Sequence, residues 1–264
     1  MLAYEICGSG VPLVLLHAFP LSSAMWKPEA RALEEIAQVI LPDLPGFGRS
    51  PRQTRPSIPG MAEAVAQLLD SLKIKDPVFI GGLSMGGYVA FEFLRQFPQR
   101  VRGLGLFSTR AAADTSEGRE KRMQTIQKIQ SEGLPAFTEK VVLNLLGKTT
   151  LETKPEVVRY VKEMILNNQA EGVTDALLAM AERRDSTELL QSIQCPTLAI
   201  AGEEDSFVPL KEAESFAKQI PGVEFRVMKK AGHLANLENP PAFRSLLKDF
   251  LLSKIVCREN KMGL

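Results

Sequence analysis

Seven residues organise this chain: Gly81-Gly82-Leu83-Ser84-Met85-Gly86-Gly87. They follow the apolar run 78–80 and precede a helical pattern over 88–94. A short β-rich run that breaks into glycines around one serine and then takes up helical periodicity predicts a strand-to-helix turn with Ser84 at its tip. Gly82 and Gly86 remove Cβ atoms where strand and helix approach closely, and the strained turn lifts the hydroxyl clear. Ser84 is therefore the candidate nucleophile.

The sequence on both sides of this turn alternates strands with helices. Patterns typical of strands occupy 2–7, 13–16, 38–41 and 101–107, and helical stripes occupy 25–36 and 57–72. The run Leu13-Val14-Leu15-Leu16 is apolar enough to be buried on both faces, as strands of parallel sheets are. This alternation predicts an α/β fold with a mostly parallel, doubly wound sheet.

The alternation stops between Arg110 and Asp185, where only helical repeats occur, and it resumes with a strand at 197–201, a helix at 210–220, a strand at 223–228 and a closing helix at 240–252. We expect a core of two parts, 1–109 and 186–264, interrupted by a helical cap, 110–185. Such an insertion would cover the carboxyl edge of the sheet and determine the substrate specificity. The candidates for an apolar lining of the site are Leu134, Phe137, Val141, Val142, Leu145 and Leu146. Packing of these residues within the cap would explain their apolar character equally well.

Composition narrows the class of protein. The chain has 264 residues, and 45% hydrophobic with 24% charged residues is ordinary for a globular protein with a large core. A net charge of +1 gives no reason to expect nucleic acid or an anionic membrane surface as partner. No apolar run reaches transmembrane length, and Cys7, Cys195 and Cys257 suggest neither a disulfide framework nor a metal site. We expect a cytoplasmic protein, with a homodimer left open.

A serine hydroxyl needs a base within hydrogen-bond reach, and the base needs an anion to hold its tautomer. The chain has two histidines, His17 at the end of the second strand and His233 in a loop after the last strand. The acid candidate, Asp205, follows the strand at 197–201, so the order Ser84, Asp205, His233 is that of one type of hydrolase. Its neighbours Glu203 and Glu204 are alternatives, although the shorter aspartate suits a turn better.

Five motifs in this order resemble the α/β-hydrolase fold family over nearly the whole chain. They are His17-Ala18-Phe19-Pro20, with Ala18 where the family usually has glycine, Asp43-Leu44-Pro45-Gly46-Phe47-Gly48-Arg49-Ser50, Gly82 to Gly86, Gly202 to Asp205 with Pro209, and Gly232-His233. The resemblance implies Ser84 as nucleophile, His233 as general base and Asp205 as the residue that orients it. It also implies an oxyanion hole from the backbone N–H groups of Phe19 and Met85, without metal or cofactor.

The predicted activity is hydrolysis of carboxylic esters with small or medium acyl groups through an acyl-enzyme. A lactonase, an enol-lactonase or a carbon–carbon bond hydrolase of the same fold stays open, as does a small-molecule receptor or regulator. Ser84 disfavours the dehalogenases, which use aspartate, and Leu234 disfavours the hydroxynitrile lyases, which place lysine there. Arg110 is expected to meet a substrate carboxylate or to pair with Asp114.

Other residues near these motifs have structural interpretations. His17 is expected to brace its loop by hydrogen bonds rather than to titrate in catalysis. Asp43 is expected to stabilise its own Pro/Gly turn. Trp26 falls on the apolar stripe of its helix and is expected in the core.

Overall fold

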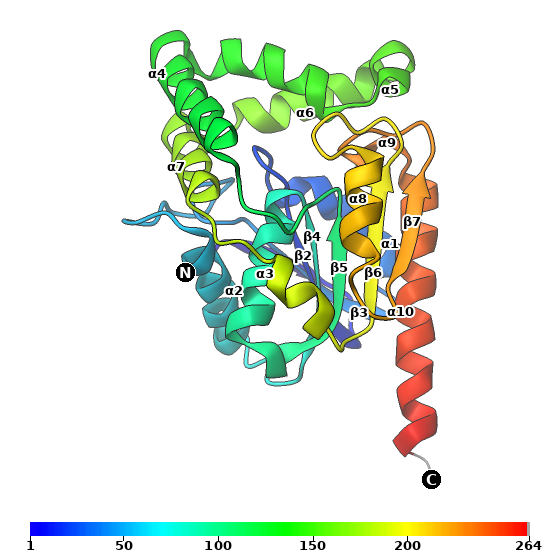
Figure 1. Cartoon of the computed structure of the whole chain (residues 1–264). Coiled ribbons are helices and arrows are strands. Elements are labelled where there is room, and N and C mark those ends of the chain that lie inside the picture. Colours follow the sequence, from blue (N-terminus) through cyan, green and yellow to red (C-terminus); the bar gives the residue numbers. More distant parts are fainter. Residues whose placement is uncertain (263–264) are drawn as a thin grey trace.

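The computed structural model describes the backbone of residues 1–262 and the side chains of residues 1–255. In this part of the chain seven strands form one sheet in the order β1-β3-β2-β4-β5-β6-β7. Only β1 runs antiparallel to its neighbour, so the sheet is mostly parallel, as predicted (Figure 1). The strands are β1 (Tyr4–Cys7), β2 (Val11–Leu16), β3 (Ala37–Pro42), β4 (Val78–Leu83), β5 (Val101–Phe107), β6 (Thr197–Gly202) and β7 (Glu224–Met228).

Helices cover both faces of the sheet, with α2 beside α3 on one face and α1 beside α10 on the other (Figure 1). The sequence positions most of them because α1, α2, α3 and α8 each lie between two successive strands and return the chain to the start of the next strand. The helices of the core are η1 (Ser23–Trp26), α1 (Lys27–Leu33), α2 (Ile58–Ser71), α3 (Met85–Gln96), η2 (Pro98–Arg100), η3 (Thr187–Ser192), α8 (Leu210–Ala217), α9 (Ala235–Glu238) and α10 (Pro240–Met262).

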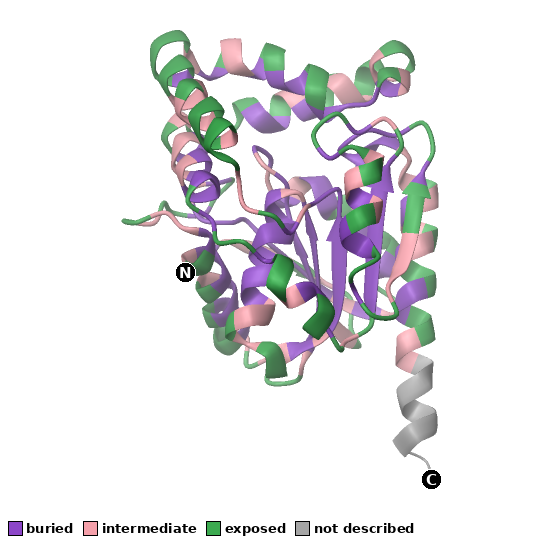
Figure 2. Ribbon diagram, viewed as in Figure 1, coloured by how far each residue is buried: buried purple, intermediate pink, exposed green. Residues whose placement is uncertain are grey.

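The core lies on both faces of the central strands, which are buried along their whole length (Figure 2). This double burial is the reason why these strands read as continuous apolar runs. Trp26 is fully buried, and its ring centroid lies 6.0 Å from that of Phe107 and 5.8 Å from that of Phe243. The prediction that Trp26 belongs to the core is confirmed.

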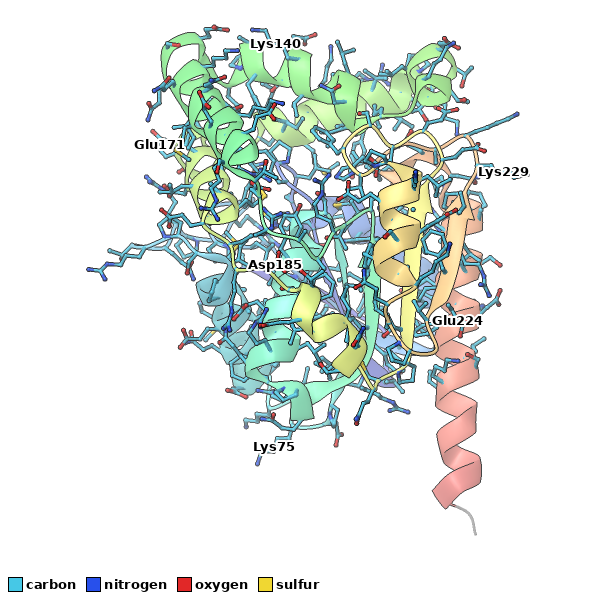
Figure 3. All side chains as sticks on the ribbon, in the orientation of Figure 1. Lys75, Lys140, Glu171, Asp185, Glu224 and Lys229 are labelled. Carbon is cyan, nitrogen blue, oxygen red and sulfur yellow. The ribbon has the colours of Figure 1, made fainter. Side chains whose placement is uncertain are left out.

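Four helices between β5 and β6 form a layer over the carboxyl edge of the sheet (Figure 1). They are α4 (Ser116–Leu145), α5 (Lys148–Thr153), α6 (Pro155–Leu166) and α7 (Ala170–Ala181), and no strand occurs within 110–185. We call this layer the cap. Helix α4 is interrupted at Gly133, where φ is 82°, two residues before Pro135. Charged side chains such as Lys140 are exposed at the cap end of the molecule, and Lys75 is exposed at the opposite end (Figure 3).

The last helix is longer than predicted. The expected helix over 240–252 continues to Met262. Ile255 still packs against the core, and Lys254 Nζ lies 2.8 Å from Glu224 Oε1, so the contacts that favour helix persist beyond the apolar pattern. No helix within residues 1–262 is long and apolar enough to cross a membrane. Cys7 and Cys195 are free thiols, whereas the side chain of Cys257 lies outside the described residues.

Candidate active site

Ser84 occupies the turn between β4 and α3 in a strained backbone conformation, with φ 55° and ψ −112°. A Cβ added at Gly82 would lie 2.1 Å from the carbonyl of Gly86, and one added at Gly86 would lie 2.3 Å from Leu16 O. The two glycines therefore let strand and helix approach closely, as predicted. The Ser84 N–H donates to Phe107 O at 2.9 Å, which fixes the turn to the end of β5.

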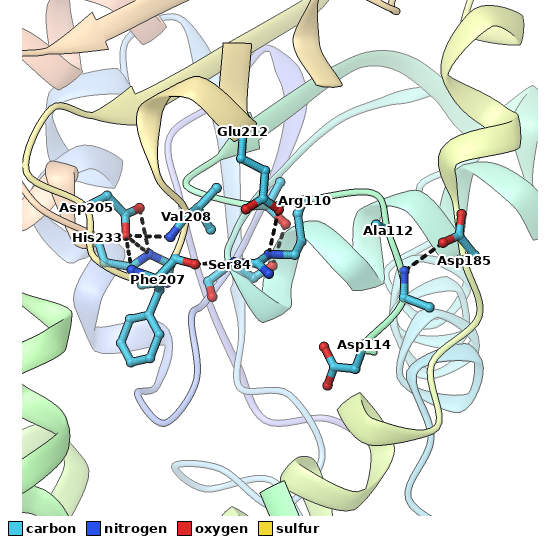
Figure 4. Close-up of polar contacts among 12 residues, drawn as sticks. Ser84, Arg110, Ala112, Asp114, Asp185, Asp205, Phe207, Val208, Glu212 and His233 are labelled. Carbon is cyan, nitrogen blue, oxygen red and sulfur yellow. Dashed lines mark hydrogen bonds and ion pairs between the residues drawn. The ribbon is translucent and has the colours of Figure 1, made fainter. Parts of the chain in front are cut away.

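His233 and Asp205 form a buried hydrogen-bonded pair to one side of Ser84 (Figure 4). His233 Nδ1 lies 2.8 Å from Asp205 Oδ2 and 3.0 Å from Oδ1. Asp205 Oδ1 also accepts the N–H groups of Phe207 and Val208 at 2.8 and 3.0 Å. Burial opposes ionisation of Asp205, but His233 and these two N–H groups lower the pKa of its carboxyl group below the usual value. With Nδ1–H donated to this carboxylate, Nε2 of His233 is left with its lone pair.

The neighbouring glutamates bind elsewhere. Glu203 accepts the N–H of Lys230 at 3.1 Å, and Glu204 accepts the N–H and the hydroxyl of Thr149. Asp205 is therefore the one residue of the three in contact with His233 among the described side chains.

His17 is also fully buried, and its ring binds backbone on both sides. Its Nε2 accepts the N–H of Leu44 at 2.9 Å, and Nδ1 lies 3.0 Å from Ala18 O. Burial lowers the pKa of His17 below its usual value, which fits a neutral ring with Nδ1–H as donor. The prediction that His17 braces its loop is confirmed. Asp43 acts similarly, since its carboxylate accepts the N–H groups of Ser23 and Arg49.

Two backbone N–H groups lie unused beside Ser84. Among the described residues, neither the Phe19 N–H nor the Met85 N–H has a hydrogen-bond partner. Met85 is the first residue of α3, where the helix dipole also favours negative charge. Phe19 precedes a cis peptide bond to Pro20 in the loop after β2. Both groups are free to bind an anion.

A cavity of about 580 Å³ lies between the core and the cap, and both Ser84 and His233 line it. This volume is in the range of small-molecule sites. Of the six apolar cap residues proposed as lining, Phe137, Val141 and Leu145 border the cavity. The other three, Leu134, Val142 and Leu146, pack within the hydrophobic core instead.

Arg110 lines the same cavity beside Ser84 (Figure 4). Its Nε lies 3.2 Å from Glu212 Oε1, and its Nη2 donates to Phe207 O. The alternative pairing with Asp114 is wrong, because Asp114 is held by Arg122 and by Arg183, whose Nη1 lies 2.6 Å from Oδ1. That cluster ties the start of the cap to Arg183, two residues after the end of α7.

Sequence reasoning missed two buried side chains that support the site. Asn168 of the cap donates to Pro20 O at 2.9 Å and accepts the Gly48 N–H at 2.8 Å. The carboxylate of Glu238 accepts three backbone N–H groups beside His233. No local pattern predicts the contacts of Asn168 with Gly48 and Pro20, or that of Glu238 with Gly147, because these partners are distant in sequence. In the described part of the chain, no three His, Cys, Asp or Glu side chains are placed to hold a metal ion.

A family model described as the alpha/beta hydrolase fold matches residues 11–240. The chain belongs to this family. Among curated α/β-hydrolases, it is 32% identical to a pimeloyl-[acyl-carrier protein] methyl ester esterase of Yersinia enterocolitica, over 94% of this chain and 96% of that one.

Solved structures of α/β-hydrolases superpose closely on the chain. A thermophilic esterase from Thermogutta terrifontis, with malate bound, has a TM-score of 0.93 at 39% identity and covers 96% of this chain and 93% of that chain. An enol-lactonase from Burkholderia xenovorans has a TM-score of 0.88 at 26% identity, with 95% and 96% covered. The fold is thus that of hydrolases with ester and lactone substrates.

Proposed function

We propose that this α/β-hydrolase is a serine carboxylic-ester hydrolase, with Ser84 as nucleophile, His233 as general base and Asp205 as the residue that orients the base. The observation that carries the proposal is the buried hydrogen bond between His233 and Asp205 at a cavity that Ser84 also lines. The similarity to esterases supports the same reaction class.

In this mechanism His233 Nε2 takes the proton of the Ser84 hydroxyl as Oγ attacks the ester carbonyl carbon. The oxyanion that forms accepts the N–H groups of Phe19 and Met85, neither of which has another hydrogen-bond partner among the described residues. Such donors are worth about 3 to 4 kcal/mol each in the transition state. His233 then protonates the leaving alcohol, and water attacks the acyl-Ser84 by the same steps in reverse order.

The cavity supports a substrate with a small or medium acyl group. Phe19, Phe137, Val141 and Leu145 give it apolar walls, and about 580 Å³ is in the range of pockets that bind small molecules. A lactone or enol-lactone fits the same chemistry, because ring opening needs the same nucleophile, base and oxyanion hole. The similarity to an enol-lactonase favours this second substrate class.

The test is hydrolysis of p-nitrophenyl esters from acetate to long acyl chains, together with γ- and enol-lactones, by wild type and by Ser84→Ala. We expect many turnovers by wild type on short or medium acyl groups and a loss of several orders of magnitude in kcat/KM in the variant. Release of one product molecule per protein would instead indicate a receptor. A variant as active as wild type would refute the assignment of Ser84.

A further inference from the structure

The loop of His233 is held by a buried carboxylate that the proposed reaction does not use. Glu238, the last residue of α9, is fully buried and does not border the cavity. Its Oε1 accepts the N–H of Gly232 at 2.9 Å and that of Leu234 at 3.1 Å. These are the residues on either side of His233. One oxygen therefore fixes the backbone before and after the general base.

The other oxygen of Glu238 reaches the cap. Its Oε2 accepts the N–H of Gly147 at 2.8 Å, 91 positions earlier in the chain. Gly147 belongs to the segment 145–149 that joins α4 to α5, which we call the cap corner. In Figure 1 this end of the cap lies directly over α9.

The cap corner and the His233 loop also contact each other directly, in addition to their link through the Glu238 carboxylate. A Cβ added at Gly232 would lie 2.2 Å from Gly147 N, so glycine is required for the approach. Leu234 N donates to Leu145 O at 3.3 Å. Glu204, next to Asp205, binds Thr149 in the same corner. Both loops of the acid and base pair thus rest on one segment of the cap.

A negative charge on Glu238 suits the binding of these backbone N–H groups. The pKa of Glu238 lies above its usual value because burial, which raises it, outweighs the Thr150 side chain and the three N–H partners, which lower it. All three partners are donors, so the ionised form satisfies every one of them with its two oxygens. A buried carboxylate with several N–H donors forms stronger hydrogen bonds than a neutral amide would.

We propose that Glu238 is a positioning residue for His233, and that it makes the cap corner a part of the support of the general base. The proposal rests on the proposed function for His233. Glu238 contacts neither the cavity nor the reacting atoms, so it acts on the rate of the chemical step and leaves substrate binding unchanged.

Two variants separate the two oxygens of Glu238. In Glu238→Gln the amide oxygen keeps the Gly232 and Leu234 donors, and the amide nitrogen faces the Gly147 N–H, so only the link to the cap is lost. Glu238→Ala removes all three links. Glu139→Gln is the matched control, because it breaks an exposed cap ion pair with Lys162 away from the cavity.

The first measurement is steady-state hydrolysis of the preferred p-nitrophenyl ester. We expect kcat to fall about 10-fold in Glu238→Gln and about 100-fold in Glu238→Ala, with KM within about twofold, because small displacements of a catalytic group cost rate rather than binding. The control keeps the wild-type kcat. Values are corrected for the folded fraction of each variant, and Glu238→Gln, which keeps the size of the side chain, serves if Glu238→Ala does not fold.

The second measurement does not need catalysis. The chain has two histidines, so the His233 Nδ1 proton, bound to Asp205, is observable by NMR with the His17 Nδ1 proton as internal reference. We expect faster exchange of the His233 proton with water in both variants and no change at His17. A kcat within twofold of the control, or unchanged exchange at His233, would overturn the proposal. A wild type without esterase activity would refute the proposed function, while the exchange rates would still test Glu238.

Discussion

Replacing Asp205 with asparagine tests whether Asp205 keeps the ring proton of His233 on Nδ1. Asp205 Oδ1 accepts two backbone N–H groups, from Phe207 and Val208, whereas Oδ2 faces His233 Nδ1 at 2.8 Å. In Asp205→Asn the amide oxygen must stay with the two N–H donors. The amide nitrogen then faces Nδ1 and donates to it, which moves the ring proton to Nε2. His233 can no longer accept the proton of Ser84.

The expected loss follows from this change of tautomer. A base that presents N–H instead of a lone pair costs roughly 10³ to 10⁴ in kcat/KM, or about 4 to 5.5 kcal/mol of transition-state stabilisation. The free energy of unfolding should change little at pH 7.5, because every hydrogen bond is exchanged rather than lost. Ester hydrolysis at pH 7.5 and urea unfolding measure the two quantities.

Glu203→Gln is the control, since Glu203 lies on the same loop and binds only the N–H of Lys230 among the described residues. It should keep wild-type activity. An Asp205→Asn enzyme within tenfold of wild type, with its fold intact, would refute the role of Asp205 and the tautomer argument.

Three further predictions concern the elbow, the core and the cavity. Gly82→Ala places a Cβ 2.1 Å from backbone atoms and should lower the free energy of unfolding, measured in urea, by about 3 kcal/mol or more. Gly118→Ala is the control and should not lower it, because its added Cβ would make only ordinary van der Waals contact. Equal stability of the two variants would contradict the close approach of strand and helix at the Ser84 turn. Burial raises the pKa of Glu29 to about 7 from 4.5, so the folded state binds more protons than the unfolded state in that range, and stability should fall by up to about 3 kcal/mol as pH rises from below 4.5 to above 7. Glu29→Gln should lack that fall when unfolding is measured at pH 5 and pH 8, and a wild-type pH dependence in the variant would count against it. Arg110→Ala should reduce the preference for anionic over neutral esters if Arg110 meets a substrate carboxylate, and an unchanged preference would exclude that role.

The sequence predicted the elements because their causes are local. The apolar run before Ser84 and the helical stripe after it determine strand, turn and helix within a few residues, and the observed φ of 55° agrees. The role of the glycines at 82 and 86 could be predicted for the same reason. The order of Ser84, Asp205 and His233 along the chain was enough to predict a shared edge of the sheet, because parallel strands end on one side.

The supports of the site could not be predicted, because they depend on contacts between distant segments. Glu238 meets Gly147 across 91 positions, and Asn168 meets Pro20 across 148. Arg110 was expected to contact either a substrate carboxylate or Asp114, yet it pairs with Glu212 of α8. Nothing in the local pattern distinguishes these side chains from ordinary surface residues.

The contact between the cap corner and the loops of Asp205 and His233 limits how the substrate specificity of this α/β-hydrolase can be changed. A chimaera that receives the whole cap of a relative would also receive a foreign segment in contact with Gly232 and Glu204, and we expect its rate of hydrolysis to fall as its selectivity changes. A graft that exchanges Phe137 and Val141 in α4 and Leu177 and Met180 in α7, but keeps 145–149, changes the walls of the cavity alone. A graft whose boundaries leave the cap corner intact should therefore change substrate specificity without lowering the catalytic rate.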